Sequence, residues 1–495
     1  MKIAIIGAGF AGLSSAKVLG SLGHEITVFE KAPDVGGVWS STRRYPGLTT
    51  QNNKQTYHLS ELKMPRRYPQ WLASEQVQEY LETYVERFGL GGCLRLGTEI
   101  TKVTPTTDED GWLVTANGET EQFDHVVVAN GIFSTPVIPD YEGVAELEAA
   151  GGRLISTSDL RSLDEVAGRH VLMVGYGKSS CDVAAAVAEV AESTDLIARD
   201  LLWKVPRKVA GILNYKYLLL TRFGEGLFPY QKLTGVEKLL HANNSRIAHG
   251  LTESVGAVVT RQLGLEKLGL VPEKPFHTIA KASVSLASEG FYEGVRDGSI
   301  TVHRRRTITR FLEKNSKPYA ELSDGTVLRA DVVICGTGFR QEVPFFDDAI
   351  QQRLTDADGN FLLYRHILPL DVPNLTFAGY NSSFFSPLSA EMAAVWTGSY
   401  LAGAHTLPTA DQMRASTTER IAWMEARTDG HHARGTNVVP FSLHNIDEVL
   451  DEAGLNLGKF TRALQWLAPV SPWSYRKVSR RLARRIASLE QPRAD

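Results

Sequence analysis

Two stretches of the chain share one order of features: an apolar strand, a glycine turn and a helix. The first is KIAIIGAGFAGLSSAKVL, which starts at residue 2, and the second is HVLMVGYGKSSCDVAAAV, which starts at residue 170. Strands that are apolar on both faces are typical of the centre of a parallel sheet, where helices cover both sides. The repeat therefore predicts an α/β fold with two Rossmann-like dinucleotide-binding domains.

The first glycine turn, GAGFAG, has the spacing of a phosphate-binding turn. Glycines at these positions permit the tight turn, the approach of a pyrophosphate to the backbone and close packing of helix on strand. Glu30 ends the next strand, about 20 residues further on, where a carboxylate accepts hydrogen bonds from ribose hydroxyls and repels a 2′-phosphate. We expect FAD or NAD here rather than NADP, and a ligand-free glycine turn is the alternative. The expected contact residues are Gly7, Gly9, Gly12 and Glu30.

The second turn, GYGKSS, differs from the first in its third glycine and in its acidic residue. Ser180 replaces the third glycine, and the next strand ends in Ala198-Arg199 instead of an acid. A cation at that point selects the 2′-phosphate of NADP, which arginine can hold through two parallel hydrogen bonds. Solvated surface charge is the alternative interpretation of the cations. The expected contact residues are Gly175, Gly177, Lys178, Ser179, Ser180, Arg199 and Lys204.

Two dinucleotide sites in one chain imply electron transfer between two cofactors. With Glu30 assigning FAD to the first turn and Arg199 assigning NADPH to the second, hydride would pass from the nicotinamide to the flavin. The three cysteines, Cys93, Cys181 and Cys335, are far apart in sequence, so a redox-active cysteine pair is not expected to accept the electrons.

Two later apolar strands, each led by an aspartate, resemble one another. FDHVVVANG spans residues 123–131 and ADVVICGTGF spans residues 330–339, and each closes on small residues. The echo indicates that a late strand completes each nucleotide domain. The residues expected to lie near a cofactor at the ends of these strands are Asn130, Gly131, Gly336, Thr337 and Gly338.

We expect the NADPH-binding domain to be inserted into the FAD-binding domain. The two parts of the FAD-binding domain are then residues 1–160 and 326–450. The NADPH-binding domain spans residues 161–325, with an irregular and helical excursion at about 201–275. A basic helical tail is expected at residues 451–495.

The motifs together resemble a known family, the class B flavoprotein monooxygenases, which comprise the flavin-containing and the Baeyer–Villiger monooxygenases. The resemblance covers about residues 1–405 and is carried by GAGFAG, FEKAPDVGGVW, GYGKSSCD, VICGTGF and SPLSAEMAAVWTG. It implies that NADPH reduces FAD and that oxygen adds to the reduced flavin as a C4a-(hydro)peroxide. One oxygen atom then passes to a small organic substrate. By this resemblance the loop close to the flavin comprises Lys31, Gly36, Gly37, Val38 and Trp39.

Departures from the family pattern bear on the reaction. GVWSSTRRYPGLTTQ is one residue longer than the Baeyer–Villiger motif and has Gln51 in place of its aspartate. Gln51 and Asn52 are the catalytic candidates, because a side-chain amide can donate a hydrogen bond to a flavin-bound oxygen, and ordinary loop amides are the alternative. These features favour oxygen transfer to a soft nitrogen or sulfur nucleophile. Baeyer–Villiger insertion, an NADPH oxidase or diaphorase, and a non-catalytic NADP-binding protein are the alternatives.

Bulk composition bears on partners and location. A net charge of −3 argues against a general nucleic-acid binder, and few, scattered cysteines together with no expected signal peptide indicate a cytoplasmic protein. The expected partners are a small organic substrate and O2, and a homodimer is the working hypothesis for assembly. The tail helix SYRKVSRRLARRIASL has one apolar face, which fits a membrane surface, a partner protein or packing on its own domain.

Overall fold

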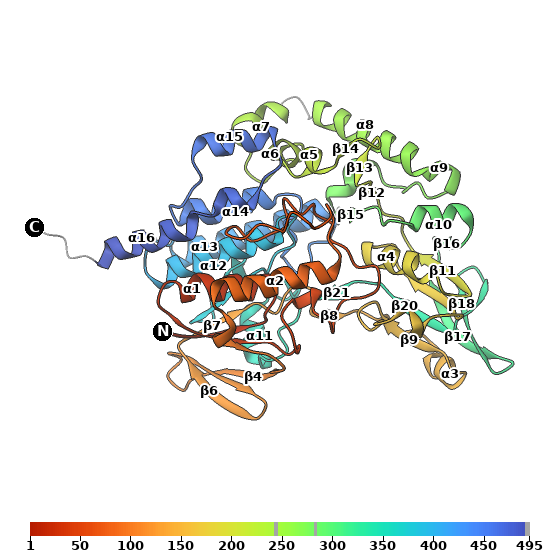
Figure 1. Ribbon diagram of the computed structural model, residues 1–495, viewed down its shortest axis with the longest axis horizontal. Helices are drawn as coiled ribbons and strands as arrows, with labels where there is room; N and C mark the ends of the chain where they lie inside the picture. The colour runs from red at the N-terminus through yellow and green to blue at the C-terminus, as the bar shows by residue number, and fades with distance from the viewer. Residues whose placement is uncertain (242–245, 282–284, 491–495) are drawn as a thin grey trace, which may run out of the picture.

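The computed structural model describes residues 1–241, 246–281 and 285–490. Two five-stranded parallel sheets organise the chain (Figure 1), and both have helices packed against them. In the first sheet the strand order is β24-β7-β1-β2-β3, and in the second it is β16-β11-β10-β20-β9. The strands of the first sheet are β1 (Lys2–Ile6), β2 (Glu25–Phe29), β3 (Leu94–Arg95), β7 (His125–Val128) and β24 (Leu375–Phe377). Those of the second are β9 (Arg153–Ser156), β10 (His170–Val174), β11 (Ser193–Ala198), β16 (Thr301–Arg304) and β20 (Val332–Cys335).

The two sheets follow one plan, which confirms the predicted pair of Rossmann-like units. In the first, β1 lies between β2 and β7, and in the second β10 lies between β11 and β20. Both central strands are almost wholly buried along their length. The echoing late strands therefore complete one sheet each, β7 beside β1 and β20 beside β10.

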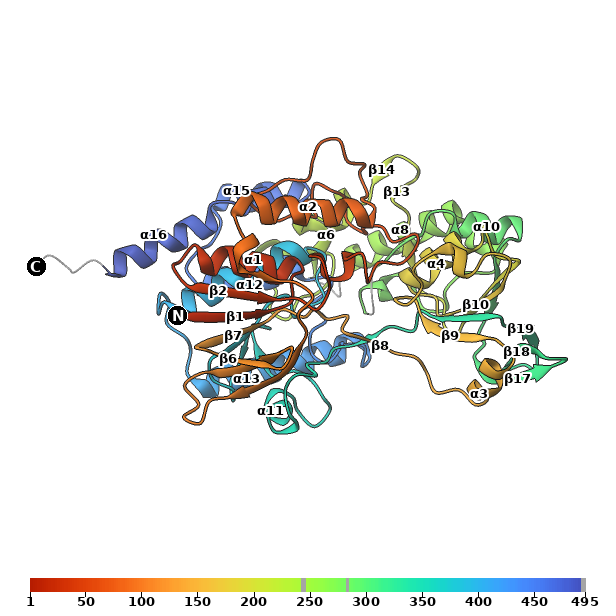
Figure 2. The same cartoon turned by 60° about the horizontal axis from the view of Figure 1, so that its bottom comes forward.

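The second domain is longer than the sequence indicated. Its sheet takes in β9 and β20, which lie before and after the predicted range 161–325. The reason is that β20 pairs in parallel register with β10, from Val171 opposite Val332 to Val174 opposite Cys335. The chain crosses between the domains twice, at β8 (Thr135–Pro136) and β21 (Phe339–Arg340), and these segments pair antiparallel, so both crossings run side by side (Figure 2).

Each domain also carries a three-stranded antiparallel meander just before its late strand. Strands β4 (Ile100–Pro105), β5 (Trp112–Ala116) and β6 (Glu119–Phe123) precede β7. Strands β17 (Ile308–Lys314), β18 (Lys317–Leu322) and β19 (Val327–Arg329) precede β20. The repeated plan extends beyond the glycine turns.

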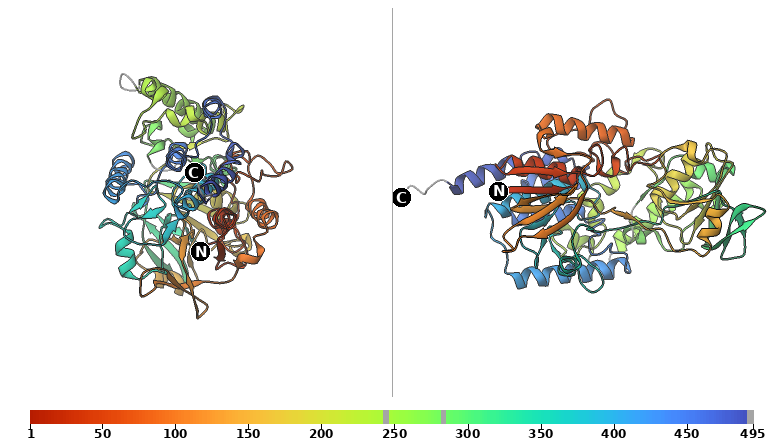
Figure 3. Two further views of the ribbon diagram at one scale, coloured as in Figure 1. Left: turned by 90° about the vertical axis from the view of Figure 1, so that its left-hand side faces the viewer. Right: turned by 90° about the horizontal axis from the view of Figure 1, so that it is seen from below.

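Two long apolar helices cover one face of the first sheet. Helix α1 (Phe10–Gly20) packs against α12 (Ser386–Leu401) in the domain seen from two sides in Figure 3. The residues of α12 are buried almost throughout. The contact is close because α12 carries small residues: a Cβ added at Gly398 would lie 2.6 Å from Leu22 Cδ1. Helix α2 (Ser74–Phe88) lies at the side of this layer.

The excursion after β11 is mainly helical and packs on C-terminal helices. It contains α5 (Lys216–Leu219), α6 (Arg222–Gly226), α7 (Gly235–Leu240), α8 (Arg246–Leu263) and α9 (Leu265–Leu268), with short strands β12 (Lys204–Val205), β13 (Lys208–Val209), β14 (Leu213–Asn214) and β15 (Ser285–Leu286). The C-terminal part contributes α13 (Ala410–Thr428), α14 (Ser442–Glu452), α15 (Lys459–Leu467) and α16 (Val478–Glu490). The remaining elements are α3 (Val144–Ala149), α4 (Lys178–Val187), α10 (Phe291–Asp297), α11 (Asp348–Leu354), β22 (Leu363–Tyr364) and β23 (Leu368–Pro369).

Candidate cofactor and substrate site

Two positions of the first glycine turn are packed so tightly that only glycine fits. Gly7 has φ +111°, and a Cβ there would lie 2.5 Å from the carbonyl oxygen of Ala129. A Cβ at Gly12 would lie only 1.8 Å from the carbonyl oxygen of Gly7. Gly9 caps α1 without a side-chain hydrogen bond, so the first N–H groups of this helix remain available to phosphate oxygens. The turn is therefore shaped as a cradle for a pyrophosphate.

Glu30 lies at the carboxyl end of β2, beside this turn. Its carboxylate accepts hydrogen bonds from the N–H groups of Ala8 at 2.7 Å and Ala32 at 2.9 Å. A carboxylate has about four lone-pair positions, so these two bonds fix its orientation and leave acceptor capacity for two ribose hydroxyls. Glu30 thus fits the ribose contact expected of it.

The GGVW loop lies directly on the first turn. The N–H of Gly36 donates to the carbonyl of Ala8 at 3.0 Å, and a Cβ on Gly37 would lie 3.3 Å from the Cα of Gly9. Trp39 is buried and meets Tyr57 edge to face, with ring centroids 5.9 Å apart. Val38 packs partly buried on the same core, whereas Lys31 is exposed.

The late strand of the first domain, β7, ends beside the first glycine turn, where Ala129 lies against Gly7. Asn130 donates from Nδ2 to the carbonyl of Glu342 at 2.8 Å and accepts from the Tyr380 hydroxyl at 3.2 Å. Gly131 has φ +81°, and a Cβ there would meet no heavy atom within 4 Å. The structure therefore brings together the glycines of both loops, Glu30, Trp39 and the end of β7.

The second glycine turn repeats this geometry in the second domain. Gly175 has φ +106°, and a Cβ there would lie 2.7 Å from the carbonyl oxygen of Gly336. Ser180 donates from Oγ to the same carbonyl at 3.1 Å, which explains how serine replaces the third glycine. Gly336 stands where Ala129 stands in the first domain, so Gly336, Thr337 and Gly338 border the second turn. The predicted division at residue 326 had assigned them to the FAD-binding domain, and this is corrected.

Three cations gather beside the second turn. Lys178 pairs with Asp182. Lys204 is 1% exposed, and its Nζ lies 3.4 Å from Ser285 Oγ. Arg207 donates a hydrogen bond to Thr49 Oγ1 at 3.1 Å and pairs with the exposed Glu289. Burial lowers the pKa of Lys178, the neighbouring Lys204 and Arg207 lower it further, and Asp182 opposes this. Bound phosphate oxygens would relieve the repulsion.

Arg199 lies outside this cluster. Its side chain is 79% exposed and pairs with Asp200 at 3.0 Å, directly after β11. This is the end of the second strand, where a ribose 2′-substituent lies in dinucleotide-binding folds. Arg207 was not among the predicted contacts, although its place in the cationic run WKVPRK was a signal for it.

A cleft of about 240 Å³ lies between the two domains beside the second turn. Segment 44–49 and residues 73–75 line it from the first domain, and Arg161 lines it from the other side. Tyr45, in this segment, has its hydroxyl 3.0 Å from Ser179 Oγ at the start of α4. Tyr45 was missed by sequence reasoning. Only the neighbouring Pro-Gly pair marked the segment as a turn.

The two catalytic candidates are tied to different parts of the chain. Gln51 accepts through its backbone carbonyl from the Tyr215 hydroxyl at 2.6 Å and through Oε1 from the N–H of Leu286 at 3.2 Å. Its Nε2 has no hydrogen-bond partner among the described residues, so this donor is free for a ligand. Asn52 is 6% exposed and donates from Nδ2 to the carbonyl of Phe384. Gln51 is thus the better placed donor of the two.

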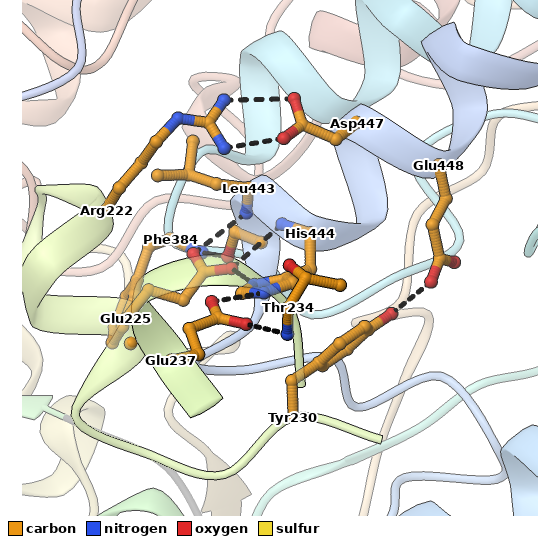
Figure 4. A network of polar contacts seen from close by, with 12 residues as sticks. Arg222, Glu225, Tyr230, Thr234, Glu237, Phe384, Leu443, His444, Asp447 and Glu448 are labelled. Atoms are coloured by element: carbon orange, nitrogen blue, oxygen red, sulfur yellow. Dashed lines mark hydrogen bonds and ion pairs between the residues drawn. The ribbon is translucent and has the colours of Figure 1, made fainter. Parts of the chain in front are cut away.

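A buried charge network holds the excursion against α14 (Figure 4). His444 bonds Glu225 at 2.5 Å through Nδ1 and Glu237 at 2.7 Å through Nε2. Although burial opposes it, these two carboxylates raise the pKa of His444 to about 10. The same segment reaches Gln51 through Tyr215, so the network also supports the loop of the site.

The residues of both glycine turns are chemically suited to binding a dinucleotide. A Cβ at Gly12 or Gly175 would clash with a backbone carbonyl, so both turns depend on glycine for their shape. The first turn has a carboxylate suited to ribose and the second has cations suited to phosphate. The residues present therefore fit FAD in the first domain and NADP in the second.

Comparison with known proteins gives one family. The model of the flavin-binding monooxygenase-like family matches residues 1–456. A 4-hydroxybenzoate brominase (decarboxylating) from Pseudoalteromonas luteoviolacea (strain 2ta16) is 29% identical over 420 residues, which is 83% of this chain and 76% of the relative. Dimethylaniline monooxygenase (N-oxide-forming) 4 from Homo sapiens is 26% identical over 443 residues, 85% of this chain and 73% of the relative.

Solved structures share the fold. Cyclohexanone monooxygenase with bound cyclohexanone has a TM-score of 0.69 at 20% identity, covering 92% of this chain and 97% of that chain. OTEMO in complex with FAD and NADP has a TM-score of 0.68 at 17% identity, covering 91% of this chain and 98% of that chain. At these identities the likeness concerns the arrangement of the two domains.

Proposed function

Because the chain belongs to the flavin-binding monooxygenase-like family, we propose that it is an NADPH- and O2-dependent monooxygenase acting on a soft nitrogen or sulfur nucleophile of a small organic substrate. The protein is an oxidoreductase and a flavoprotein monooxygenase whose cofactors are FAD and NADP(H). The selection of NADPH over NADH and the choice of nucleophile are the proposed parts.

FAD, when bound, supplies the acceptance of hydride and the activation of oxygen, chemistry that no side chain carries. The protein binds, orients and shields. Glu30 and the first turn would hold the ribose and the pyrophosphate, while Trp39 and Tyr57 form an apolar wall beside the GGVW loop. The free Nε2 of Gln51 supplies a hydrogen-bond donor at the junction of the domains.

One observation supports oxygen transfer to nitrogen or sulfur: the loop at 51–52 presents amides and carries no carboxylate. Gln51 is held by Tyr215 and Leu286 with its donor free, so it can orient an oxygen-bearing group but cannot accept a proton from one. A soft nucleophile attacks an electrophilic oxygen without needing a protein base. A relative whose name describes N-oxide formation agrees with this proposal.

The test compares oxygen acceptors in one assay. We expect NADPH-dependent oxygen consumption with a thioether or a tertiary amine, and the sulfoxide or N-oxide as the product identified by mass spectrometry. A lactone or ester from a ketone, with heteroatom acceptors unchanged, would support Baeyer–Villiger insertion instead. Hydrogen peroxide as the only product would indicate an NADPH oxidase, and a protein isolated colourless would indicate a non-catalytic NADP-binding protein.

Coenzyme selection gives a second prediction. Arg199→Ala should raise the dissociation constant of NADPH about 10- to 100-fold while that of NADH changes little, because a bidentate arginine–phosphate contact contributes about 1.5–3 kcal/mol. Lys204→Met keeps the volume of the buried side chain but removes its charge. It should weaken the binding of NADPH and of NADH equally, because both coenzymes carry the pyrophosphate that this charge would contact. Titration calorimetry measures the dissociation constants of NADPH and of NADH for each of the two variants.

Arg169→Ala is the matched control, since Arg169 is exposed and precedes β10 at the opposite end of the strand. Equal weakening of both coenzymes in Arg199→Ala would remove this residue from the 2′-phosphate site. A selective effect of Lys204→Met on NADPH would assign that role to the buried lysine instead.

A further inference from the structure

Large apolar side chains are exposed together on α7 and α15. We define the apolar patch as five residues on these two helices. Their exposed fractions run from 49% for Val236 to 85% for Leu467. The apolar patch comprises Val236 and Leu239 of α7 and Phe460, Leu464 and Leu467 of α15. A cluster of this kind on a surface normally marks a site of interaction.

The two helices lie next to each other on α6. A Cβ at Gly226 of α6 would lie 3.3 Å from the Trp466 ring and 3.6 Å from Glu237 Cγ, so α15 and α7 both pack there. Gln465 is buried and accepts from Arg222 Nε at 2.9 Å, which fixes the inward side of α15. The five residues of the apolar patch are exposed, and α7 and α15, which carry them, lie near the upper edge of the molecule in Figure 1.

Exposed cations border the apolar patch, and the carboxylates nearest α15, Asp447 and Asp451 of α14, pair with Arg462 of that helix. Across residues 201–241 and α15, all of which are described, the carboxylates are Glu225 and Glu237, and both are buried on His444 (Figure 4). The exposed lysines there point to solvent. Those at the border of the apolar patch are Lys232, Lys238 and Lys459.

We propose that the apolar patch docks on an anionic lipid bilayer. Leucine, valine and phenylalanine side chains bury at the boundary between headgroups and acyl chains, while lysines beside them meet anionic headgroups. Glu225 and Glu237 are buried on His444, and Asp447 and Asp451 pair with Arg462, which limits repulsion between these carboxylates and anionic headgroups. No helix in the described part of the chain is long and apolar enough to cross a bilayer, so the contact is peripheral.

The docking surface is a different one from that considered for the basic tail. In α16, Val478 is 1% exposed and Leu482 is fully buried, so this part of the apolar face packs on its own domain, whereas Leu489 near the end of the helix is exposed. Residues 491–495 of the tail lie outside the described residues. Of the three alternatives for the tail, packing on its own domain agrees with the burial of Val478 and Leu482.

The experiment is sedimentation of the flavin-loaded protein with vesicles. Binding to phosphatidylcholine vesicles containing about 30% phosphatidylglycerol should exceed binding to pure phosphatidylcholine, and should fall as salt rises from about 0.05 to 0.5 M. Phe460→Gln with Leu467→Gln should weaken binding about tenfold or more. Lys232→Gln, Lys238→Gln and Lys459→Gln together should abolish the preference for anionic lipid.

The control places the same change on exposed apolar residues elsewhere: Leu96→Gln with Val327→Gln, at positions that are 40% and 37% exposed. These should bind vesicles as the wild type does. Equal vesicle binding by wild type and the Phe460/Leu467 variant would overturn the proposal, as would no binding by either. A dimer in solution that this variant splits would show that a second copy covers the apolar patch, which also overturns it. Flavin content and thermal unfolding of each variant verify that it is folded.

Discussion

Replacing Gly12 with alanine should yield a protein that is purified without flavin and shows no NADPH-dependent oxygen consumption. The added Cβ would lie 1.8 Å from the carbonyl oxygen and 2.9 Å from the carbonyl carbon of Gly7. Both are backbone atoms of the turn itself, so no side-chain rotation can relieve the clash. Helix α1 would have to move away from β1, and that movement opens the cradle for the pyrophosphate.

Gly20→Ala is the matched control within the same helix. A Cβ at Gly20 would lie 3.6 Å from Ile26 Cγ1, which is an ordinary contact, so this variant should keep its flavin. Visible absorbance of the purified proteins gives the flavin content directly, and circular dichroism reports whether each is folded. A folded Gly12→Ala protein with full flavin content would contradict the assignment of the first turn.

The glycine turns were predictable because their causes are local. A buried strand, a turn needing positive φ at Gly7 and Gly175, and a helix that starts at once are all encoded within about 20 residues. The acidic residue after the first turn and its absence after the second were equally visible. The family resemblance rested on the same kind of local motif, and the family match confirms it.

The second sheet was misdivided because its last strand comes from far along the chain. The predicted boundary at residue 326 treated β20 as part of the first domain, whereas β20 pairs with β10, about 160 residues earlier in sequence. Sequence alone shows that a strand is buried on both faces and leaves open which of two similar sheets it joins.

The cation cluster was only partly predictable for a similar reason. Lys204 is buried beside the second turn because β12 pairs with β15, which brings Ser285 within 3.4 Å of its Nζ. Arg207 reaches Thr49 of the first domain. Both placements depend on tertiary pairing, and a run of lysines and arginines looks the same in sequence when it faces solvent.

The second large effect, a loss of local stability, is expected when His444 is replaced. His444→Gln leaves Glu225 and Glu237 buried without their cation, which by analogy with other buried ion pairs costs about 3–5 kcal/mol. The loss of stability should be confined mainly to α6 and α7, because these helices carry the two glutamates, and should not extend to the parallel sheets. Amide hydrogen exchange should therefore accelerate in α6 and α7 while β1 and β10 remain protected. His431→Gln, at an exposed histidine, is the control and should leave exchange unchanged.

The pH dependence of hydrogen exchange distinguishes the contribution of the His444 charge from that of the hydrogen-bond geometry in this network. The pKa of His444 is about 10 in the folded chain against 6.5 in an unfolded one, so its contribution is complete below pH 6.5 and is lost as pH rises through 10. Wild type should thus lose protection in α6 and α7 between these values, and His444→Gln should not. The triple variant Glu225→Gln, Glu237→Gln, His444→Gln removes all three charges and leaves one amide oxygen at position 225 for the backbone N–H groups of positions 443 and 444. It should therefore recover part of the lost protection. If the triple variant exchanges as fast as His444→Gln, hydrogen-bond geometry and not charge holds the excursion in place.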